Sequence, residues 1–174
     1  TGDFWQNDLS MSGGNENNTY YFSLGNVKQK GIIRESTYDR TSLRFNSNSK
    51  INDWITLSNK MYYAYTDSNR IQQSSNTAGV MLGLLRTPPD FDQRDYRGTY
   101  YTSSGVEYTK RHRSYRKYLG NSQNPSYNNP LWTIYEQIAE TKVHRITATP
   151  QLTLKPTNWL NVIARGNIDV SNDK

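Results

Sequence analysis

The residues best suited to contact a ligand lie between positions 96 and 116, where tyrosines are interspersed with basic side chains. Tyrosine rings can lie against the apolar faces of sugar rings or peptide side chains, and guanidinium groups form hydrogen bonds with acceptor oxygens. We expect this stretch to contact a substrate or a partner protein. The candidate contact residues are Tyr96, Tyr100, Tyr101, Tyr108, Arg111, Arg113, Tyr115 and Arg116.

The basic run at 110–117 also raises nucleic acid as a ligand, because Lys and Arg neutralise phosphates and aromatic rings stack on bases. The run carries no nucleic-acid recognition motif and is confined to one stretch of the chain. Tyr together with Arg, Asn and Asp suits oligosaccharides or peptides better. We therefore expect no nucleic-acid partner.

No pattern in the sequence indicates catalysis or metal binding. Asp90 and Asp92 follow two prolines, but the positions where an EF-hand loop needs its fifth ligand, its glycine and its final glutamate hold Arg94, Asp95 and Tyr101. Two histidines and no cysteine leave no zinc-ligand spacing and no thiolate. The Gly-x-Ser-x-Gly motif is absent, and no pair of carboxylates stands out. The sequence predicts no catalytic residues, no metal site and no cofactor.

The stretches that flank the candidate contact residues alternate between apolar and polar side chains, which is typical of strands with one apolar and one polar face. In 54–66, Leu57, Met61 and Tyr63 share one parity and Lys60 has the other. Pro150 interrupts another such stretch and suggests a bulge. Arg44, Lys60, Arg145 and Arg165 fall on the polar parity, which is either an ordinary solvated face or the lining of a barrel. The expected strands are about 8–13, 20–27, 38–49, 54–66, 143–154 and 160–170.

The connections between these strands are short at one end and long at the other, which is typical of an up-and-down barrel of the outer-membrane type. The predicted fold is all-β, with about six antiparallel up-and-down strands that form part of a large transmembrane β-barrel. We expect four barrel strands in 1–66 and a barrel hairpin in 141–174. Between them, 67–140 is expected to be a long extracellular loop with a short helix near 77–85, ended by two prolines.

The composition fits this type of fold better than a compact soluble domain. Leu, Ile, Val and Phe supply 32 of the 174 residues, whereas Asn, Ser and Thr supply 53. So few apolar residues would indicate disorder in a highly charged chain, but the net charge is +6 and 14 residues are tyrosine. No apolar run approaches the 18 residues of a transmembrane helix. In a wide barrel, lipid covers one face of each strand, so few apolar residues suffice.

Two tryptophans follow tight turns in the same way, Trp54 after Asn52-Asp53 and Trp159 after Thr157-Asn158. Indole rings prefer the lipid headgroup level, where barrels carry aromatic girdles. We expect Trp54 and Trp159 to belong to such a girdle at the membrane interface. The alternative is that each ring covers the end of a soluble sheet.

An ordered series of short blocks runs along most of the chain. The blocks are SMSGG (10–14), YYFSLG (20–25), QKGII (29–33), YDR (38–40), SLRFN (42–46), KINDWI (50–55), LRTPP (85–89), GTY (98–100), NPL (129–131) and WL (159–160). This series closely resembles the barrel of SusC/RagA-type TonB-dependent outer-membrane transporters. The resemblance implies a 22-stranded barrel that imports oligosaccharides or peptides across the Gram-negative outer membrane. It also implies contact with membrane lipid, a SusD-like surface lipoprotein over the extracellular loops, and a plug and TonB-coupling segment that lie outside these residues.

The sequence as a whole favours a barrel segment of such an importer, with passage rather than chemistry as its role. Six strands would leave two open edges, and unpaired backbone groups in lipid cost several kcal/mol each, so we expect the chain to be part of a longer protein. The alternative from another class is a soluble β-rich carbohydrate-binding or adhesin module. In that module the apolar faces of the strands would pack against one another across a sandwich.

Overall fold

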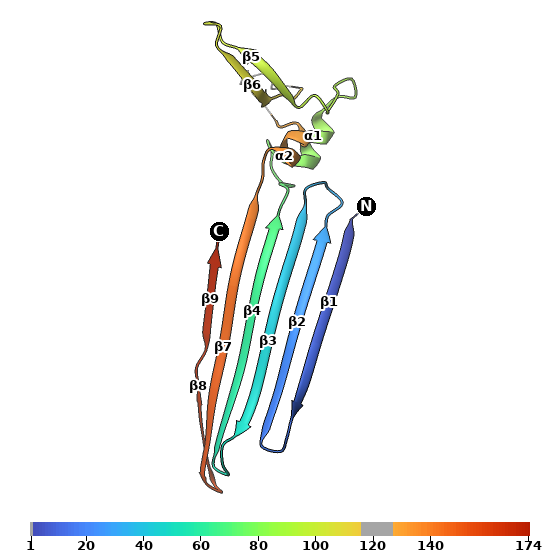
Figure 1. The fold of residues 1–174 in the computed structure, drawn as a ribbon. Coiled ribbons are helices and arrows are strands. Elements are labelled where there is room, and N and C mark those ends of the chain that lie inside the picture. Colours follow the sequence, from blue (N-terminus) through green and yellow to red (C-terminus); the bar gives the residue numbers. More distant parts are fainter. Residues whose placement is uncertain (1, 116–126) are drawn as a thin grey trace. The chain divides into compact units, whose positions relative to one another are not determined.

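The computed structural model describes residues 2–115 and 127–174 and divides the chain into two compact units (Figure 1). The sheet unit comprises Thr1–Lys30, Thr37–Ser68 and Thr141–Lys174. The loop unit comprises Gly31–Ser36 and Asn69–Glu140. The candidate contact residues of the sequence fall in the loop unit, and the candidate girdle tryptophans fall in the sheet unit.

The sheet unit is a seven-stranded sheet with the spatial order β1-β2-β3-β4-β7-β8, in which β9 also pairs with β7 (Figure 1). Each pair of strands with a described register is antiparallel, which confirms the predicted fold class. Most strands are longer than the sequence pattern predicts. They are β1 (Asp3–Gly14), β2 (Asn18–Lys30), β3 (Thr37–Lys50), β4 (Ile55–Asn69), β7 (Glu140–Thr157), β8 (Leu160–Arg165) and β9 (Ile168–Asp173).

The extra strand arises because the last expected strand is interrupted opposite Pro150. β7 continues through Pro150, whereas its neighbour breaks between β8 and β9, where the Gly166 N–H donates to the Pro150 carbonyl at 3.0 Å. Proline has no N–H to offer the ladder, so regular pairing is lost at this level. At the level of Pro150 the interruption therefore lies in the partner strand, whereas the bulge of β7 lies between Leu154 and Thr157.

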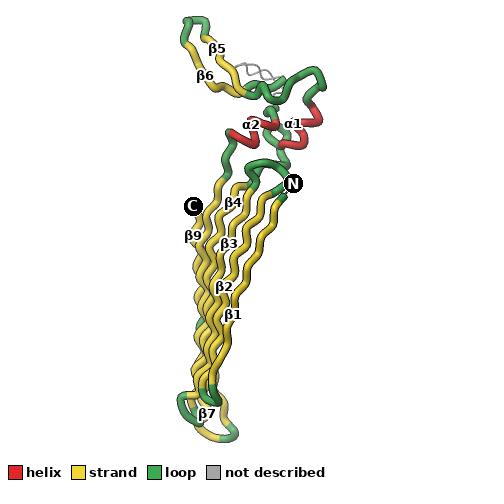
Figure 2. The backbone as a smooth tube through the Cα atoms, turned by 45° about the vertical axis from the view of Figure 1, so that its right-hand side comes forward, coloured by secondary structure: helices red, strands yellow, loops and turns green. Residues whose placement is uncertain are grey.

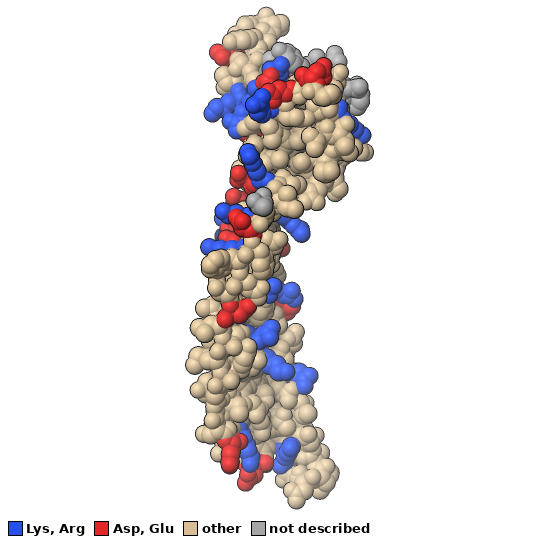
Figure 3. Space-filling view, turned by 90° about the vertical axis from the view of Figure 1, so that its right-hand side faces the viewer, with Lys and Arg blue, Asp and Glu red and all other residues tan. Residues whose placement is uncertain are grey.

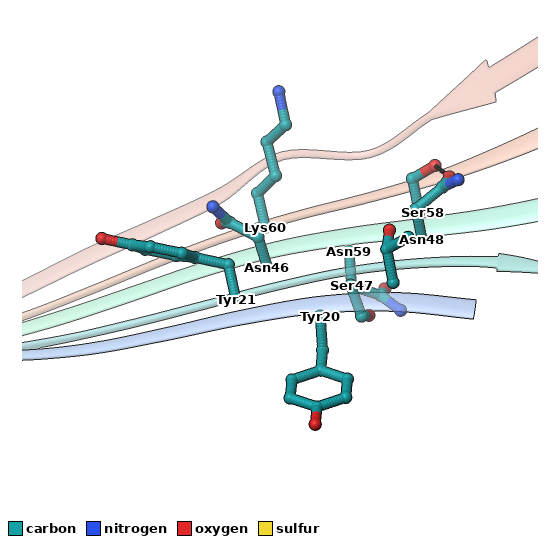
Figure 4. A pocket seen from close by; sticks show the side chains of 9 residues that line it. Tyr20, Tyr21, Asn46, Ser47, Asn48, Ser58, Asn59 and Lys60 are labelled. Atoms are coloured by element: carbon teal, nitrogen blue, oxygen red, sulfur yellow. Dashed lines mark hydrogen bonds between the residues drawn. The ribbon is translucent and has the colours of Figure 1, made fainter. Parts of the chain in front are cut away.

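The register of the sheet gathers apolar side chains on one face. Leu9 lies opposite Leu24, and Leu24 lies opposite Leu43. Because successive side chains point to opposite faces, the alternate residues form a second, polar face. Figure 4 shows the alternation, with Tyr21 and Lys60 on one side of the sheet and Tyr20 on the other. We call these the apolar face and the polar face. The apolar face also carries Met11, Phe22, Phe45, Met61, Ile146, Val162, Ile168 and Val170.

The apolar face is uncovered. The exposed fractions are 65% for Leu9, 58% for Met11 and 55% for Val170. Within this unit the strands form a single layer (Figure 2). Ala64 is the only buried hydrophobic residue that the described part of the sheet unit contains. The sheet therefore has no hydrophobic core of its own among these residues.

Asparagine side chains form the tight turns at one end of the sheet. The Asn52 side-chain oxygen accepts hydrogen bonds from the N–H groups of Trp54 at 3.0 Å and Ile55 at 2.8 Å. Asn15 makes the equivalent pair of bonds in the turn between β1 and β2. Such Asx turns satisfy the backbone locally, which explains how these connections can be so short.

The described residues of the loop unit form two short helices and a two-stranded hairpin (Figure 2). They are α1 (Val80–Arg86), α2 (Pro130–Tyr135), β5 (Arg97–Tyr101) and β6 (Glu107–His112). The sequence pattern does not predict α2, β5 or β6. No helix of the described ranges has the length and hydropathy needed to cross a membrane.

A small hydrophobic core holds the loop unit together. Ile71, Val80 and Ile134 are buried in it, and Ile33 and Leu131 pack against it. Ile33 belongs to the turn between β2 and β3, and its packing ties that turn to the loop unit. The long connection between β4 and β7, in which we expected one short helix, is therefore packed together with the β2–β3 turn.

The two ends of the long connection between β4 and β7 meet within the loop unit. The Arg70 N–H donates to the Ala139 carbonyl at 3.3 Å, and the Ala139 N–H donates to the Asn69 side-chain oxygen at 3.1 Å. Asn69 also donates from its amide nitrogen to the Glu35 carbonyl at 2.8 Å. These bonds bring residues that are 70 positions apart in sequence side by side.

Candidate functional site

The hairpin β5–β6 carries a stacked pair of predicted contact residues. Tyr100 and Tyr108 are register partners, with ring centroids 5.1 Å apart and ring planes within 12° of parallel. The Arg111 guanidinium carbon lies 4.8 Å from the centroid of the Tyr108 ring. Both rings are half-buried, and Arg111 is exposed. Three of the eight predicted residues thus form one continuous strip, which we call the hairpin strip.

A β-bulge places Arg111 in this strip. Gly98 pairs with Arg111 and Tyr100 pairs with Tyr108, so β6 has one residue more than β5 between the two pairs. Lys110 takes up the extra residue with a φ of 53°, in the left-handed region that non-glycine residues rarely occupy. In a regular strand Tyr108 and Arg111 would point to opposite faces, and the bulge brings them together.

Two other predicted residues lie at the base of the hairpin and not in the strip. The ring centroids of Tyr96 and Tyr135 are 5.8 Å apart. The guanidinium carbon of Arg97 lies 5.1 Å from the centroid of the Tyr96 ring. Arg113 forms an ion pair with Asp95 and donates its backbone N–H to the Tyr96 carbonyl at 2.9 Å. Tyr96 and Arg113 therefore hold the hairpin to the rest of the loop unit.

The remaining predicted contact residues are separate from the strip. Tyr101 is 65% exposed and lies opposite Glu107, next along the hairpin from the stacked pair. Tyr115 is also exposed, and its ring meets that of Phe91 edge to face at 6.3 Å. Arg116 lies outside the described residues. The structure thus brings Tyr100, Tyr108 and Arg111 together and leaves Tyr101 and Tyr115 apart.

Two carboxylates between the prolines and the hairpin, those of Asp92 and Asp95, form ion pairs with arginines. Asp92 accepts hydrogen bonds from the Arg94 side chain at 2.7–3.1 Å, and these bonds lower the pKa of Asp92 to about 2. Asp95 pairs with Arg113. In the described ranges, no three His, Asp or Glu side chains are grouped so that they could hold a metal ion.

Asn129 is a structural residue that the sequence analysis missed. It is 1% exposed, and its side chain caps α2 by accepting from the Leu131 N–H at 2.9 Å and donates to the Gln93 carbonyl at 2.9 Å. Its backbone N–H donates to His112 Nε2 at 3.1 Å. Asn followed by Pro at the first helical position is a helix-start signal, so the sequence could have revealed this residue.

Trp54 and Trp159 lie in two tight turns at the same end of the sheet, Trp54 between β3 and β4 and Trp159 between β7 and β8. The Lys155 N–H, close to one turn, donates to the Trp54 carbonyl at 2.7 Å. Trp54 is 50% exposed and Trp159 is 83% exposed. Both rings are thus at least half exposed, and their place in an aromatic girdle stays a prediction.

A second group of aromatic residues lies toward the other end of the apolar face, and sequence reasoning did not single it out. The Tyr63 hydroxyl lies 2.9 Å from His144 Nδ1, and the Tyr65 ring lies 4.6 Å from the His144 ring. Trp5 is 67% exposed on the same face of β1. Rows of Leu, Ile, Val, Met and Phe lie on this face between these residues and the end of the sheet with the tight turns. The period-two pattern predicts the face, but only the structure shows that Tyr63 and Tyr65 meet His144 across strands.

These features define a class of protein. One layer of antiparallel strands has an uncovered apolar face and a polar face, short turns at one end and a large folded connection at the other. In a transmembrane β-barrel, lipid contacts the apolar face and the polar face lines the interior. The sheet unit has the architecture of a segment of such a barrel wall.

Comparisons with known proteins agree with this class. The chain is 27% identical over 95 residues to TonB-dependent receptor P39 of Formosa agariphila (strain DSM 15362 / KCTC 12365 / LMG 23005 / KMM 3901 / M-2Alg 35-1), covering 55% of the chain and 9% of P39. It is 28% identical over 86 residues to TonB-dependent receptor P26 of the same strain, covering 49% of the chain and 8% of P26. The chain therefore spans about a tenth of the length of these relatives. No family model matches.

Solved structures show the same fold over almost the whole chain. The RagAB peptide importer in its closed-closed state superposes with a TM-score of 0.65 and 22% identity, covering 97% of this chain and 17% of that one. A second structure, of the RagAB peptide transporter, gives a TM-score of 0.67 and 21% identity, covering 98% and 18%. The chain is thus a SusC/RagA-like barrel segment in its fold, and its sequence is similar to that of TonB-dependent receptors.

Proposed function

We propose that this chain forms part of the barrel wall of a TonB-dependent importer in the outer membrane of a Gram-negative bacterium. The importer takes up oligosaccharides or peptides and works with a SusD-like surface lipoprotein. The sheet unit contacts lipid with its apolar face and lines the interior with its polar face. The loop unit, extracellular in this proposal, contacts the cargo or the lipoprotein. Energy coupling through TonB belongs to other parts of the protein.

The observation that carries the proposal is the uncovered apolar face of the sheet. Leu9, Met11 and Val170 are more than half exposed, although burying such side chains is worth about 1.5–3 kcal/mol each. A surface of this kind on a single antiparallel layer is stable when lipid covers it. The similarity to named TonB-dependent receptors supports the same function.

The alternative, a soluble carbohydrate-binding or adhesin module, requires a second layer against the apolar face. A β-sandwich packs two sheets face to face about 10 Å apart. Within the sheet unit, the described residues provide one layer only. The geometry therefore favours the barrel wall over the soluble module.

Tryptophan quenching in the full-length protein tests the proposal. Three variants, each retaining one of the residues Trp54, Trp159 and Trp132 as the sole tryptophan, are reconstituted in bilayers that contain brominated lipid. Trp54 and Trp159 should be quenched. Trp132, which packs against His112 inside the loop unit at 4.9 Å between ring centroids, should not be and serves as the control.

The outcome decides between the two functions. Unquenched Trp54 and Trp159 would contradict both the girdle and the barrel wall. Cooperative unfolding of an isolated 1–174 polypeptide in buffer without detergent would instead support the soluble module. Loss of lipoprotein co-purification when Tyr101 and Tyr115 are both changed to Ala would support the proposed role of the loop unit.

A further inference from the structure

The middle of the polar face carries a group of positive charges from two adjacent strands. Arg40 and Arg44 of β3 and Lys60 of β4 point to the same side, as the Ser58–Asn48 hydrogen bond between the two strands requires. All three are exposed side chains. We call them the wall cations. Figure 4 shows Lys60 projecting from this side of the sheet beside Asn46.

The wall cations have no acidic partner among the residues that the structure describes. Within residues 2–115 and 127–174, no carboxylate lies within ion-pair distance of Arg40, Arg44 or Lys60. Some cations of the sheet unit do form ion pairs, as Lys50 does with Asp53 at 2.7 Å and Arg145 does with Asp169 at 2.6 Å. Figure 3 shows Lys and Arg side chains recurring along the sheet unit. Mutual repulsion among three cations on one stretch of the polar face is a cost that a bound anion would reduce.

Tyr62 holds the two arginines in place. Arg40 donates a hydrogen bond to the Tyr62 hydroxyl, and the Arg44 guanidinium carbon lies 5.6 Å from the centroid of the Tyr62 ring. A guanidinium that lies over a ring and donates along its edges is a pre-organised fork for a carboxylate. Lys60, on its flexible stem, supplies a movable point charge beside it.

The space beside these side chains is hollowed and polar. A surface hollow of about 310 Å³ is lined by Arg44, Asn46, Lys60, Met61, Tyr62, Thr147 and Thr149. The hydroxyl and amide groups of this lining can donate to and accept from the neutral parts of a ligand. The hollow is open, which fits a ligand that passes along the wall and does not stay.

We propose that the wall cations form a binding site for carboxylate groups of the cargo, so that the importer selects acidic oligomers. This inference rests on the proposed function, because it takes the polar face as the lining of the passage. Arg44 and Lys60 contact the carboxylate directly. Arg40 is a positioning residue, because its hydrogen bond to Tyr62 fixes the ring over which Arg44 lies. Acidic oligosaccharides and acidic peptides both present this group.

Binding to the full-length receptor tests the site. Labelled oligogalacturonate and labelled tetraglutamate are the acidic probes, and a labelled malto-oligosaccharide and tetraglycine are their neutral counterparts. We expect the unmodified receptor to bind at least one acidic probe more tightly than its neutral counterpart. Whichever acidic probe binds identifies the source of the carboxylate.

Arg44→Gln together with Lys60→Gln should weaken acidic-probe binding about tenfold or more, since each removes a charge-assisted hydrogen bond. Arg165→Gln is the matched control. Arg165 lies on the same face but donates to Gln151 at 2.6 and 2.8 Å, away from the hollow, so its loss should leave binding unchanged.

Three results would overturn the site. They are the absence of acidic-probe binding to the unmodified receptor, equal losses for acidic and neutral probes in the double variant, and an equal loss in the Arg165→Gln control. Tryptophan quenching in brominated lipid is measured on the same samples. Normal quenching with one of these results rejects the site alone, whereas absent quenching rejects the barrel wall and the proposed function with it.

Discussion

Tyr100 and Tyr108 face each other across the β5–β6 hairpin, with ring centroids 5.1 Å apart and planes 12° from parallel. The pair carries Arg111 at its end, because a bulge at Lys110 returns the guanidinium to the same side. The hairpin strip is therefore fixed before any ligand arrives. Pre-organisation of this kind reduces the entropy that binding would otherwise cost.

Removal of one ring should loosen the hairpin. An aromatic pair is worth about 0.5–1.5 kcal/mol beyond its buried area, so Tyr108→Ala should accelerate amide hydrogen exchange in 97–112 by about two- to tenfold. Tyr101→Ala is the control, because Tyr101 is largely exposed and stacks on no described ring. Equal exchange rates in the two variants would show that stacking does not order the hairpin.

Loss of the Asn129 side chain should destabilise the loop unit. Asn129→Ala removes the cap of α2 and leaves the Gln93 carbonyl without its donor, which together cost about 1–3 kcal/mol. We expect faster proteolytic cleavage within 87–115 in the full-length protein. Asn76→Ala, at an exposed position, should be cleaved at the unmodified rate. Slow cleavage of both variants would contradict the anchoring role of Asn129.

The two faces of β1 should respond oppositely to a new charge. Leu9→Arg places a cation on the apolar face and should cost about 2–4 kcal/mol if lipid covers that face at mid-depth. Ser10→Arg places the same cation on the polar face and should cost little. Urea unfolding of the reconstituted full-length protein measures both. A soluble fold would show no such asymmetry tied to the presence of lipid.

Acid should release the turn at Asp92. Its pKa is lowered from the ordinary 3.8 to about 2 by hydrogen bonds from Arg94, so the pairing stabilises the folded loop above pH 3.8. This stabilisation is lost as the pH falls toward 2. A nitroxide label at Asp90→Cys should gain mobility over that interval. In an added Asp92→Asn background the label should be mobile at every pH, and unchanged pH curves would contradict the pairing.

The sheet could be predicted from the sequence because each strand follows a local rule. In β4, Leu57, Met61 and Tyr63 share the parity that the structure places on the apolar face. The break opposite Pro150 follows equally from the missing N–H of proline. The number of strands was harder to predict, because the break lies at Gly166, in the strand that pairs with Pro150, and not at the proline itself.

The loop unit could be predicted only in part because polar residues fill much of its interior. Asn129, Thr133 and Ser114 are each 1% exposed. Hydrophobic periodicity in the sequence cannot identify buried side chains that are polar. Tyr and Arg at 96–113 suggested a contact surface, and the structure assigns Tyr96 and Arg113 to the internal support of the hairpin. The wall cations lie on the predicted polar parity, but their lack of acidic neighbours depends on which strands are adjacent.

The bonds that join Arg70 and Asn69 to Ala139 affect how the sheet assembles. Neighbouring strands such as β1 and β2 need only close a turn of a few residues, which takes microseconds. β4 and β7 can pair only when the ends of the long connection between them come together, and this closure has an entropic cost that other contacts must offset. The folded loop unit offsets this cost, because its hydrophobic core and the hydrogen bonds at Ala139 hold the two strand ends together. We therefore expect a variant that folds this unit slowly to delay the pairing of β4 with β7 and to leave the formation of the β1–β2 and β2–β3 hairpins unchanged.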